Sequence, residues 1–525
     1  MGASADRRVR RGNGRRQWWR TAPLALAIGA ALSCQGAWAG EWQFTPRLTL
    51  GQVYTDNVTL APRGKEQWDL FSQITPGLSL HGKGGRVSAD VDYQLENYVS
   101  VRTRDHDSTS NRLKANATAE LARQWLYLDA SGGITQQIIS PQERIAVSNL
   151  YHSQNLTDVY TYSVSPYLRH NFGGYANALL RYKYAQVFYG KSGISNTQFQ
   201  TVDGRLASGR QFGRLSWGLS YHRQDQQRQT TSNVKFENAA ANIGYQVLPS
   251  LSLLAQGGYE NNQYQTTRTA VVNGTYWGVG LGWRPNRYFS ARALKGNQFE
   301  TAGVSIAPSP RTSLSATYRK RAVGLNPGHT WSGTFNLNTR RTSWQALYLE
   351  DTTTVQQLAL QQGYLVFPVI DPTTNQQVVD ATGTPVFVAR AVTFLGLTND
   401  VLVRKIAKGS FGFKTARTGI RLSVFDERRQ YQFSGQKQRT KGVNESWSWR
   451  FATRTSSILT AGWQRTGYAT ASGNTDLWYV DETIHRRIAP RLTGDLSYRH
   501  ISQSGLVVGG GYDANQISFT LTMYF

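Results

Sequence analysis

The sequence is nearly free of cysteine. Its one thiol, Cys34, lies within the first 39 residues of a 525-residue chain. Disulfides, thiolate catalysis and cysteine-ligated metals are therefore excluded for the remainder. Long apolar runs are missing as well, because no stretch reaches the roughly 18 consecutive apolar residues of a membrane-spanning helix. Few segments show helical periodicity, so a helical membrane protein is not expected.

The first 39 residues have the pattern of a secretory signal peptide. Seven arginines precede the apolar stretch 22–32, and Ala-Trp-Ala at 37–39 is a small-x-small cleavage site before Gly40. We therefore expect residues 1–39 to be cleaved, leaving a single domain at 40–525. Removing the signal lowers the formal charge from +26 to about +20. Because no plug-sized segment precedes the first strand pattern, we do not expect a TonB-dependent receptor.

Common catalytic signatures are missing too. The sequence has no G-x-S-x-G, H-E-x-x-H, P-loop or calcium-loop pattern, and its histidines and serines are scattered. We therefore expect no enzyme activity, no metal site and no cofactor. A strong positive charge often indicates nucleic-acid binding, but we do not expect an exported protein to bind nucleic acid.

What the sequence does contain is alternation of apolar and polar residues. From residue 41 onward, segments such as WQFTPRLTL (42–50), VSADVDYQL (87–95) and WSWRF (447–451) place apolar side chains at every second position. Successive side chains on a strand point to opposite faces. Each segment therefore predicts a strand with one apolar face and one polar face.

The connections between these strands alternate in length. Short turns are expected near 81–85, 123–124, 172–174, 212–213, 249–250, 285–286, 310–311, 340–341, 417–418 and 489–490. Long polar loops are expected at 102–111, 139–156, 224–233 and 261–273. This alternation is typical of outer-membrane barrels. We predict an all-β fold, a transmembrane antiparallel outer-membrane β-barrel of about 24 strands (22–26), with short periplasmic turns and long extracellular loops. A large soluble β-solenoid or paired sandwiches are the alternative.

The last segment ends on an aromatic residue. Its apolar face carries Ile517, Phe519, Leu521, Met523 and Phe525. We expect this strand to pair with the first one, because a sheet in lipid must close, and its apolar row to face the outer-membrane lipids. The terminal Phe with this spacing also resembles the C-terminal signal read by the bacterial barrel-assembly machinery.

The alternation points a set of basic side chains into the lumen. They are Arg47, Arg169, Arg181, Lys183, Arg319, Arg340, Arg421, Arg450, Arg491 and Arg499. The inward acids are Asp90, Asp92, Glu96, Asp129 and Asp495. A basic lumen favours anions, such as an anionic polysaccharide. Equally, the arginines could pair with the acids and brace the wall. Three inward aromatics, Phe71, Tyr127 and Tyr167, could stack on sugars or fill space.

One long insert interrupts the pattern at 359–399. It holds two apolar runs, 364–370 and 384–392, around turn-forming residues, and we interpret it as a β-hairpin leaving the extracellular end. Two interpretations remain. The hairpin lies on the surface, or it folds into or over the pore as a gate, since long loops in compact architectures are often functional.

Several stretches resemble one known family. They are 42–62, 74–98, 155–182 and 399–410, and the most specific pieces are Y-T-D-N (54–57), I-T-P-G-L-S-L (74–80) and S-P-Y (165–167). Over nearly the whole mature chain the sequence is similar to the outer-membrane β-barrels associated with PEP-CTERM/exosortase systems, found near exopolysaccharide loci of Gram-negative bacteria. The resemblance implies a role in exopolysaccharide secretion or in the cell envelope, and it provides no catalytic residues.

These observations favour one function and leave two others open. We expect a barrel in the Gram-negative outer membrane that acts as conduit or accessory for an exported polymer, with exopolysaccharide export proteins as partners. The alternatives are a structural or surface-anchoring barrel without transport, and an anion-preferring diffusion porin.

Overall fold

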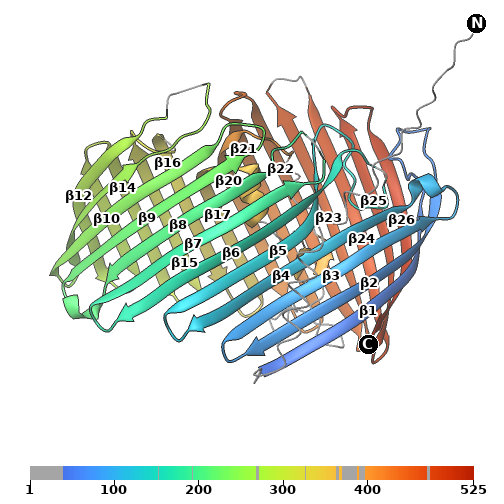
Figure 1. The fold of residues 1–525 in the computed structure, drawn as a ribbon, viewed down its shortest axis with the longest axis horizontal. Helices are drawn as coiled ribbons and strands as arrows, with labels where there is room; N and C mark the ends of the chain where they lie inside the picture. Colours follow the sequence, from blue (N-terminus) through green and yellow to red (C-terminus); the bar gives the residue numbers. More distant parts are fainter. Residues whose placement is uncertain are drawn as a thin grey trace, which may run out of the picture.

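Neighbouring strands pair into one closed sheet, shown in Figure 1. The computed structural model describes residues 40–151, 153–191, 193–267, 271–325, 327–361, 366–368, 387–389, 396–469 and 473–525. Their main sheet has 24 antiparallel strands, and the last pairs with the first. The predicted fold class is confirmed. The signal peptide and most of the 359–399 insert lie outside the described residues.

The first half of the barrel wall follows chain order. Its strands are β1 (Gly40–Thr55), β2 (Asp69–Gly84), β3 (Val87–Ser100), β4 (Ser108–Ala122), β5 (Leu126–Ile138), β6 (Leu156–Phe172), β7 (Ala176–Tyr189), β8 (Thr197–Ser208), β9 (Leu215–Arg228), β10 (Val234–Leu248), β11 (Leu251–Glu260) and β12 (Gly274–Asn286). Two 3-10 turns, η2 (Arg104–His106) and η3 (Arg210–Phe212), lie in its connections.

The second half continues in the same direction around the wall. Its strands are β13 (Phe289–Gly296), β14 (Phe299–Ser309), β15 (Thr312–Arg321), β16 (Gly328–Asn338), β17 (Thr342–Thr354), β20 (Val401–Lys414), β21 (Thr418–Tyr431), β22 (Lys437–Ala452), β23 (Thr455–Tyr468), β24 (Asn474–Ala489), β25 (Leu492–Gly505) and β26 (Tyr512–Tyr524). Between β17 and β20 lie the helix α2 (Val355–Gln361) and the paired short strands β18 (Val366–Pro368) and β19 (Phe387–Ala389).

Short turns gather at the end of the barrel that holds the C-terminus, and longer loops gather at the other. The longest described connections are 56–68, 139–155 and 261–273, together with the ends of the β17–β20 insert. Two loop predictions need correction by several residues. β9 continues to Arg228 and β4 begins at Ser108, so residues 224–228 and 108–111, which we expected in loops, lie in strands. Their inward and outward positions are both polar, so the sequence offers no alternation there.

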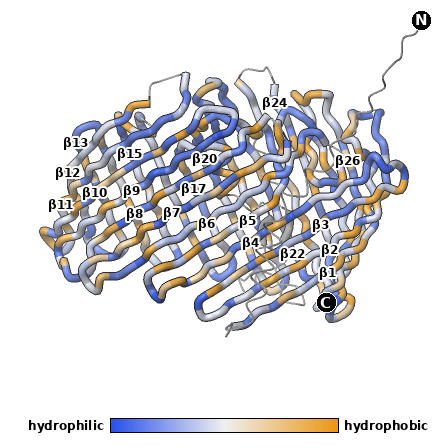
Figure 2. Tube along the Cα trace, in the orientation of Figure 1, coloured by the Kyte–Doolittle hydropathy of each residue, from blue (hydrophilic) through white to orange (hydrophobic). Residues whose placement is uncertain are grey.

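The outer face of the wall is apolar. On β12, Trp277, Val279, Leu281 and Trp283 are all about half exposed, whereas glycines occupy the inward positions between them. Apolar and polar residues follow one another along the strands in Figure 2. Aromatic pairs lie beside the short turns, such as Trp344 with Phe411 and Trp449 with Phe451. An apolar band bordered by aromatics is the lipid-facing surface of an outer-membrane barrel.

The seam between the first and last strands is well formed. Arg47 to Thr55 of β1 pair with Tyr524 to Gln516 of β26. The Phe525 amide donates a hydrogen bond to the Pro46 carbonyl at 3.0 Å. The predicted pairing of the last strand with the first is therefore confirmed, and its apolar row, Ile517 to Phe525, lies on the outer face. No helix among the described residues is long and apolar enough to cross a membrane.

Candidate functional site

Eight of the ten predicted lumen cations lie on the inward face of strands. They are Arg47, Arg169, Arg181, Lys183, Arg319, Arg421, Arg450 and Arg499. Arg340 and Arg491 are corrections, because β16 ends at Asn338 and β24 at Ala489, which leaves both side chains in exposed periplasmic turns. The alternation continues beyond the strand ends in the sequence, so it could not reveal where the wall stops.

Three of these arginines brace the wall. Both terminal nitrogens of Arg47 donate to the Asp92 carboxylate, at 2.9 and 3.0 Å, and Arg47 also contacts Ser79. Arg181 donates to Asp129 at 2.8 Å. Arg499 likewise pairs with Asp481, 2.6 Å from Nε. Arg47 and Arg181 each bridge strands that are not direct neighbours, so they add cross-links to the backbone ladder.

The other inward basic side chains have no acidic partner among the described residues, so their positive charge is not neutralised by an ion pair. Arg169, Lys183, Arg319, Arg421 and Arg450 form no ion pair with any residue that the structure describes. Arg169 lies 5.0 Å from the centre of the Tyr127 ring, and Arg450 donates to the Ala416 carbonyl. These cations make the lumen attractive to anions.

The inward aromatics have different roles. Phe71 is fully buried in a cluster with the β5–β6 loop, so it fills space. Tyr127 and Tyr167 stack on each other with ring centres 5.1 Å apart, and Arg181 lies 4.1 Å above the Tyr167 ring. Because the two rings contact each other and two arginines, we assign them to the wall's own packing.

The β5–β6 loop, 139–155, folds into the barrel. Ile145 is buried at 1% exposure, its amide donates to Gln503 Oε1 at 2.8 Å, and its carbonyl accepts from the Tyr512 hydroxyl. Gln503 in turn donates to the Glu143 carbonyl. Burial raises the pKa of Tyr151 to about 12, in keeping with its enclosed position in this cluster. The loop therefore joins β5 and β6 to the distant strands β25 and β26 across the extracellular mouth.

The start of the β17–β20 insert also enters the barrel. Helix α2 buries Ala359 against Val159, Val187 and Phe199, which face inward from β6, β7 and β8. These strands lie on nearly the opposite side of the sheet from β17. The start of the insert therefore spans the mouth rather than lying on the outer surface.

The end of the insert completes the crossing. Asn399 accepts hydrogen bonds from the Ser195 amide at 3.0 Å and from Gln356 at 3.2 Å, both at its side-chain oxygen. The Leu397 amide donates to the Ile139 carbonyl at 2.8 Å. This last bond connects the insert directly to the β5–β6 loop.

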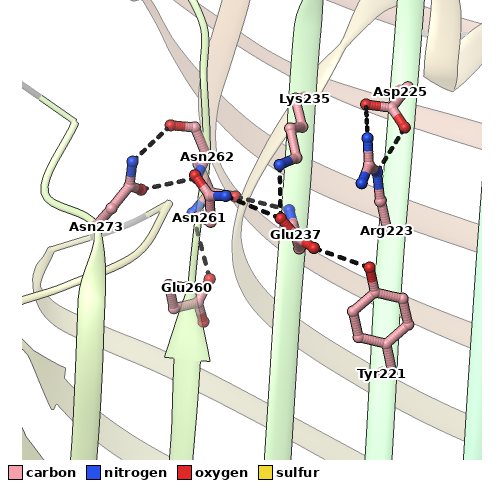
Figure 3. Close-up of polar contacts among 9 residues, drawn as sticks. All are labelled: Tyr221, Arg223, Asp225, Lys235, Glu237, Glu260, Asn261, Asn262 and Asn273. Atoms are coloured by element: carbon pink, nitrogen blue, oxygen red, sulfur yellow. Dashed lines mark hydrogen bonds and ion pairs between the residues drawn. The ribbon is translucent and has the colours of Figure 1, made fainter.

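The β11–β12 loop is the third crossing segment. Its base is fixed by Asn262 and Asn273, which exchange backbone-to-side-chain hydrogen bonds of 2.7 and 3.0 Å, and by Asn262 donating to Glu260, as Figure 3 shows. Beside it, Lys235, Tyr221 and Asn261 all donate to Glu237. From this base the loop reaches the β21–β22 connection, where the Thr267 amide donates to the Gln432 carbonyl.

We call the described parts of these crossing segments the mouth junction: 139–151 and 153–155 of the β5–β6 loop, 261–267 and 271–273 of the β11–β12 loop, and Val355–Gln361 with 396–400 of the insert. Parts of the junction, together with neighbouring strand ends, line a cavity of about 670 Å³. Its walls include 139–142, Arg228, Gln265, 396–401 and Lys437. Among the residues that the structure describes, no group of His, Cys, Asp and Glu could hold a metal ion.

Fold and lumen define the class of protein, a closed β-barrel of the outer-membrane type. No known sequence family and no curated protein matches the chain. The siderophore receptor PirA from Acinetobacter baumannii is 9% identical with a TM-score of 0.44, over 93% of this chain and 81% of that one. The FrpB iron transporter of Neisseria meningitidis (F5-1 variant) is 12% identical with a TM-score of 0.43, over 92% and 83%. OmpT from Vibrio cholerae (trimer form) is 8% identical with a TM-score of 0.26, over 63% and 100%. These similarities carry no inference about cargo.

The sequence did not single out the residues that build the junction. Arg228 lies in a polar stretch without alternation, and Ile139, Leu397 and Asn399 lie at the edges of long connections. Their partners are far away in the chain, so no local pattern marks them. The length of the connections was the one available signal.

Proposed function

We propose that this protein is a conduit, or part of one, for an exported polymer in the outer membrane of a Gram-negative bacterium, with its pathway occluded by the mouth junction. The observation that carries the proposal is the meeting of the insert and the β5–β6 loop inside the barrel opening, at the Leu397–Ile139 hydrogen bond. Loops that serve only as surface anchors have no need to cross the mouth.

The junction is weaker than the wall around it. Among the described residues, the insert and the β5–β6 loop are joined by the single Leu397–Ile139 hydrogen bond, and one hydrogen bond contributes about 1 kcal/mol net. The wall has continuous ladders, such as the pairing of Thr342 to Thr354 with Phe413 to Val401. The junction can therefore separate while the barrel stays folded.

We propose an anionic polysaccharide as the cargo. Lys183, Arg319 and Arg421 face the lumen without an ion pair among the described residues, which supports anion passage. The sequence resemblance to barrels of PEP-CTERM/exosortase systems supports an exopolysaccharide, and membership in that family is part of the proposal. Assembly by the barrel-assembly machinery and contact with export proteins are further parts of it.

We also propose that the chain has no catalytic role. Four histidines pair with carboxylates among the described residues: His81 with Asp90, His106 with Asp69, His222 with Asp203 and His485 with Asp495. The pairs lie at different places on the barrel: His81 on β2, His106 between β3 and β4, His222 on β9 and His485 on β24. Their role as wall contacts agrees with this proposal.

Planar-bilayer conductance tests the conduit. Thr354 and Val401 are directly opposite each other at the ends of β17 and β20, so a short Asn-Gly turn can replace 355–400 without altering the wall. We expect the intact barrel to be silent and the shortened barrel to conduct with anion preference. A matched control shortens the exposed loop 101–107, which lies outside the junction and should leave the barrel silent.

Two outcomes would contradict this function. If the intact barrel conducts as freely as the shortened one, the protein is a diffusion porin. If both are silent while folded, the barrel is structural. Resistance to SDS at room temperature, lost on boiling, verifies folding in each case.

A further inference from the structure

Arginine is concentrated in the turns at the periplasmic end of the barrel. Eleven connections join strands at this end, and nine of them contain an arginine. We call these side chains the turn arginines: Arg86, Arg123, Arg210, Arg214, Arg287, Arg311, Arg340, Arg341, Arg417, Arg454 and Arg491. The same eleven connections contain no lysine, aspartate or glutamate. The periplasmic rim is therefore purely cationic in its turns.

The positive charge of the turn arginines is not neutralised within the protein. All of them are exposed, and none forms an ion pair with a residue that the structure describes. The described loops at the extracellular end differ, because their arginines are accompanied by acids. Arg63 shares its loop with Asp56 and Glu66, and Arg144 follows Glu143. The excess charge therefore belongs to the periplasmic end alone.

The turns hold these guanidinium groups close to the wall. Asn286 pairs with Phe289 across the end of one hairpin, so Arg287 lies in a two-residue turn directly beyond the ladder. Arg311 and Arg491 lie in turns of the same length. Such turns cannot extend far from the strands, so their arginines lie at the edge of the apolar band.

Aromatic side chains mark the membrane interface at this edge. Trp283 and Phe289 lie on the outer face with ring centres 5.4 Å apart, and the guanidinium of Arg287 lies 4.7 Å from the centre of the Tyr288 ring. Aromatic residues border the apolar band of outer-membrane barrels and lie at the level of the lipid headgroups. The turn arginines are therefore at headgroup level in the leaflet that faces the periplasm.

We propose that the turn arginines bind the headgroups of anionic phospholipids in this leaflet. A guanidinium group donates two parallel hydrogen bonds to a phosphate, which a lysine ammonium cannot do. The turn arginines also surround the barrel, as the lipids of a leaflet do, whereas a protein docking on one side would need charge on only a few neighbouring turns. The proposal requires the barrel to lie in a membrane, but it does not require the barrel to conduct.

The test on the unaltered protein is native mass spectrometry of the full chain, released from nanodiscs with equal amounts of phosphatidylglycerol and phosphatidylcholine. Both lipids carry a phosphate, but only phosphatidylglycerol has a net negative charge. We expect the retained lipid to be enriched in phosphatidylglycerol by roughly fivefold, because basic side chains near a membrane surface attract anionic lipids by about this factor each. Equal retention of the two lipids would overturn the proposal.

A variant of one sector places the binding at the turns. It replaces by glutamine the turn arginines between β14 and β21, which are Arg311, Arg340, Arg341 and Arg417. These exposed residues lie outside the ladder, so the barrel should fold, as its resistance to SDS before boiling will show. We expect the number of retained phosphatidylglycerol molecules to fall by roughly a third, in proportion to the charge removed.

A matched control removes the same charge from the other end of the barrel. It replaces by glutamine the exposed extracellular cations Arg63, Lys65, Arg102 and Arg104. Acids accompany these cations in their loops, so lipid retention should stay unchanged. Unchanged retention in the folded sector variant, or an equal fall in the control, would overturn the assignment.

Soluble anions distinguish the lipid from other ligands of the same charge. We expect neither oligogalacturonate nor inorganic phosphate to displace phosphatidylglycerol from the barrel. Displacement by oligogalacturonate alone would overturn the lipid proposal in favour of a polymer-binding rim. Displacement by inorganic phosphate would overturn it in favour of a site for soluble phosphate.

The experiments also separate this proposal from the conduit. Selective retention of phosphatidylglycerol, in a protein that stays silent after 355–400 is replaced, would support the lipid contact and contradict the conduit. A shortened barrel that conducts, while the full chain retains both lipids equally, would support the conduit and overturn the lipid contact.

Discussion

At the scale of single residues, the face of each basic side chain was predictable but its partner was not. Side chains along a strand alternate between its two faces, so the apolar residues on either side of Arg47 are enough to place it on the lumen side. Its partner Asp92 lies on β3, two strands away, and the register of two pairings decides that contact. Bracing and substrate contact were therefore indistinguishable from sequence. The structure shows bracing by Arg47, Arg181 and Arg499.

The Arg47 brace leads to a stability prediction. Arg47→Ala leaves Asp92 inside the wall without its charged partner, and Arg47 is only 8% exposed. We expect the free energy of unfolding to fall by about 3 kcal/mol, measured by urea titration of the barrel in lipid vesicles. Arg340→Ala, in an exposed turn, should change it by less than about 0.5 kcal/mol. Equal effects of the two substitutions would contradict the bracing role.

At the scale of elements, strands were predictable and the crossing segments were not. Strand alternation is a local signal, whereas the short helix α2 depends on a surface from the far side of the barrel. A helix of seven residues is not stable alone. Ala359 has its apolar partners on β6 to β8, which precede it by more than a hundred positions. The length of the insert could therefore be predicted from the sequence, but the surfaces against which its ends pack could not.

The packing of α2 against the wall can be tested by a substitution that places one negative charge in the contact. Ala359→Glu puts a carboxylate against Val159, Val187 and Phe199, where burial of a charge is strongly unfavourable. We expect the helix to leave the wall and the otherwise intact barrel to show openings in planar bilayers. Gln357→Glu adds the same charge on the half-buried face of the same helix and should stay silent. Silence of both folded variants would show that α2 does not hold the mouth shut.

At the scale of the whole molecule, the strand count followed from repeating one local rule along the chain. Each alternating segment and each short turn was visible, so 24 strands and the closing pair of β1 and β26 could be predicted. The sequence left open whether the 359–399 insert folds into or over the pore, and it could not show which segments cross the mouth. The crossing depends on contacts such as Ile145 with Gln503, whose positions in the sequence are 358 apart. No local pattern in the sequence indicates contacts between residues so far apart in the chain.

The proposed conduit requires the lumen to conduct an anionic polymer once the mouth junction is removed. Lipid vesicles containing either the intact barrel or the barrel with 355–400 replaced by a short turn can be loaded with fluorescent oligogalacturonate. Release through the shortened barrel should be at least roughly tenfold faster than through the intact barrel, and faster than release of a neutral glucose oligomer of equal length. No release of either polymer from the shortened barrel, despite correct folding, would contradict the account.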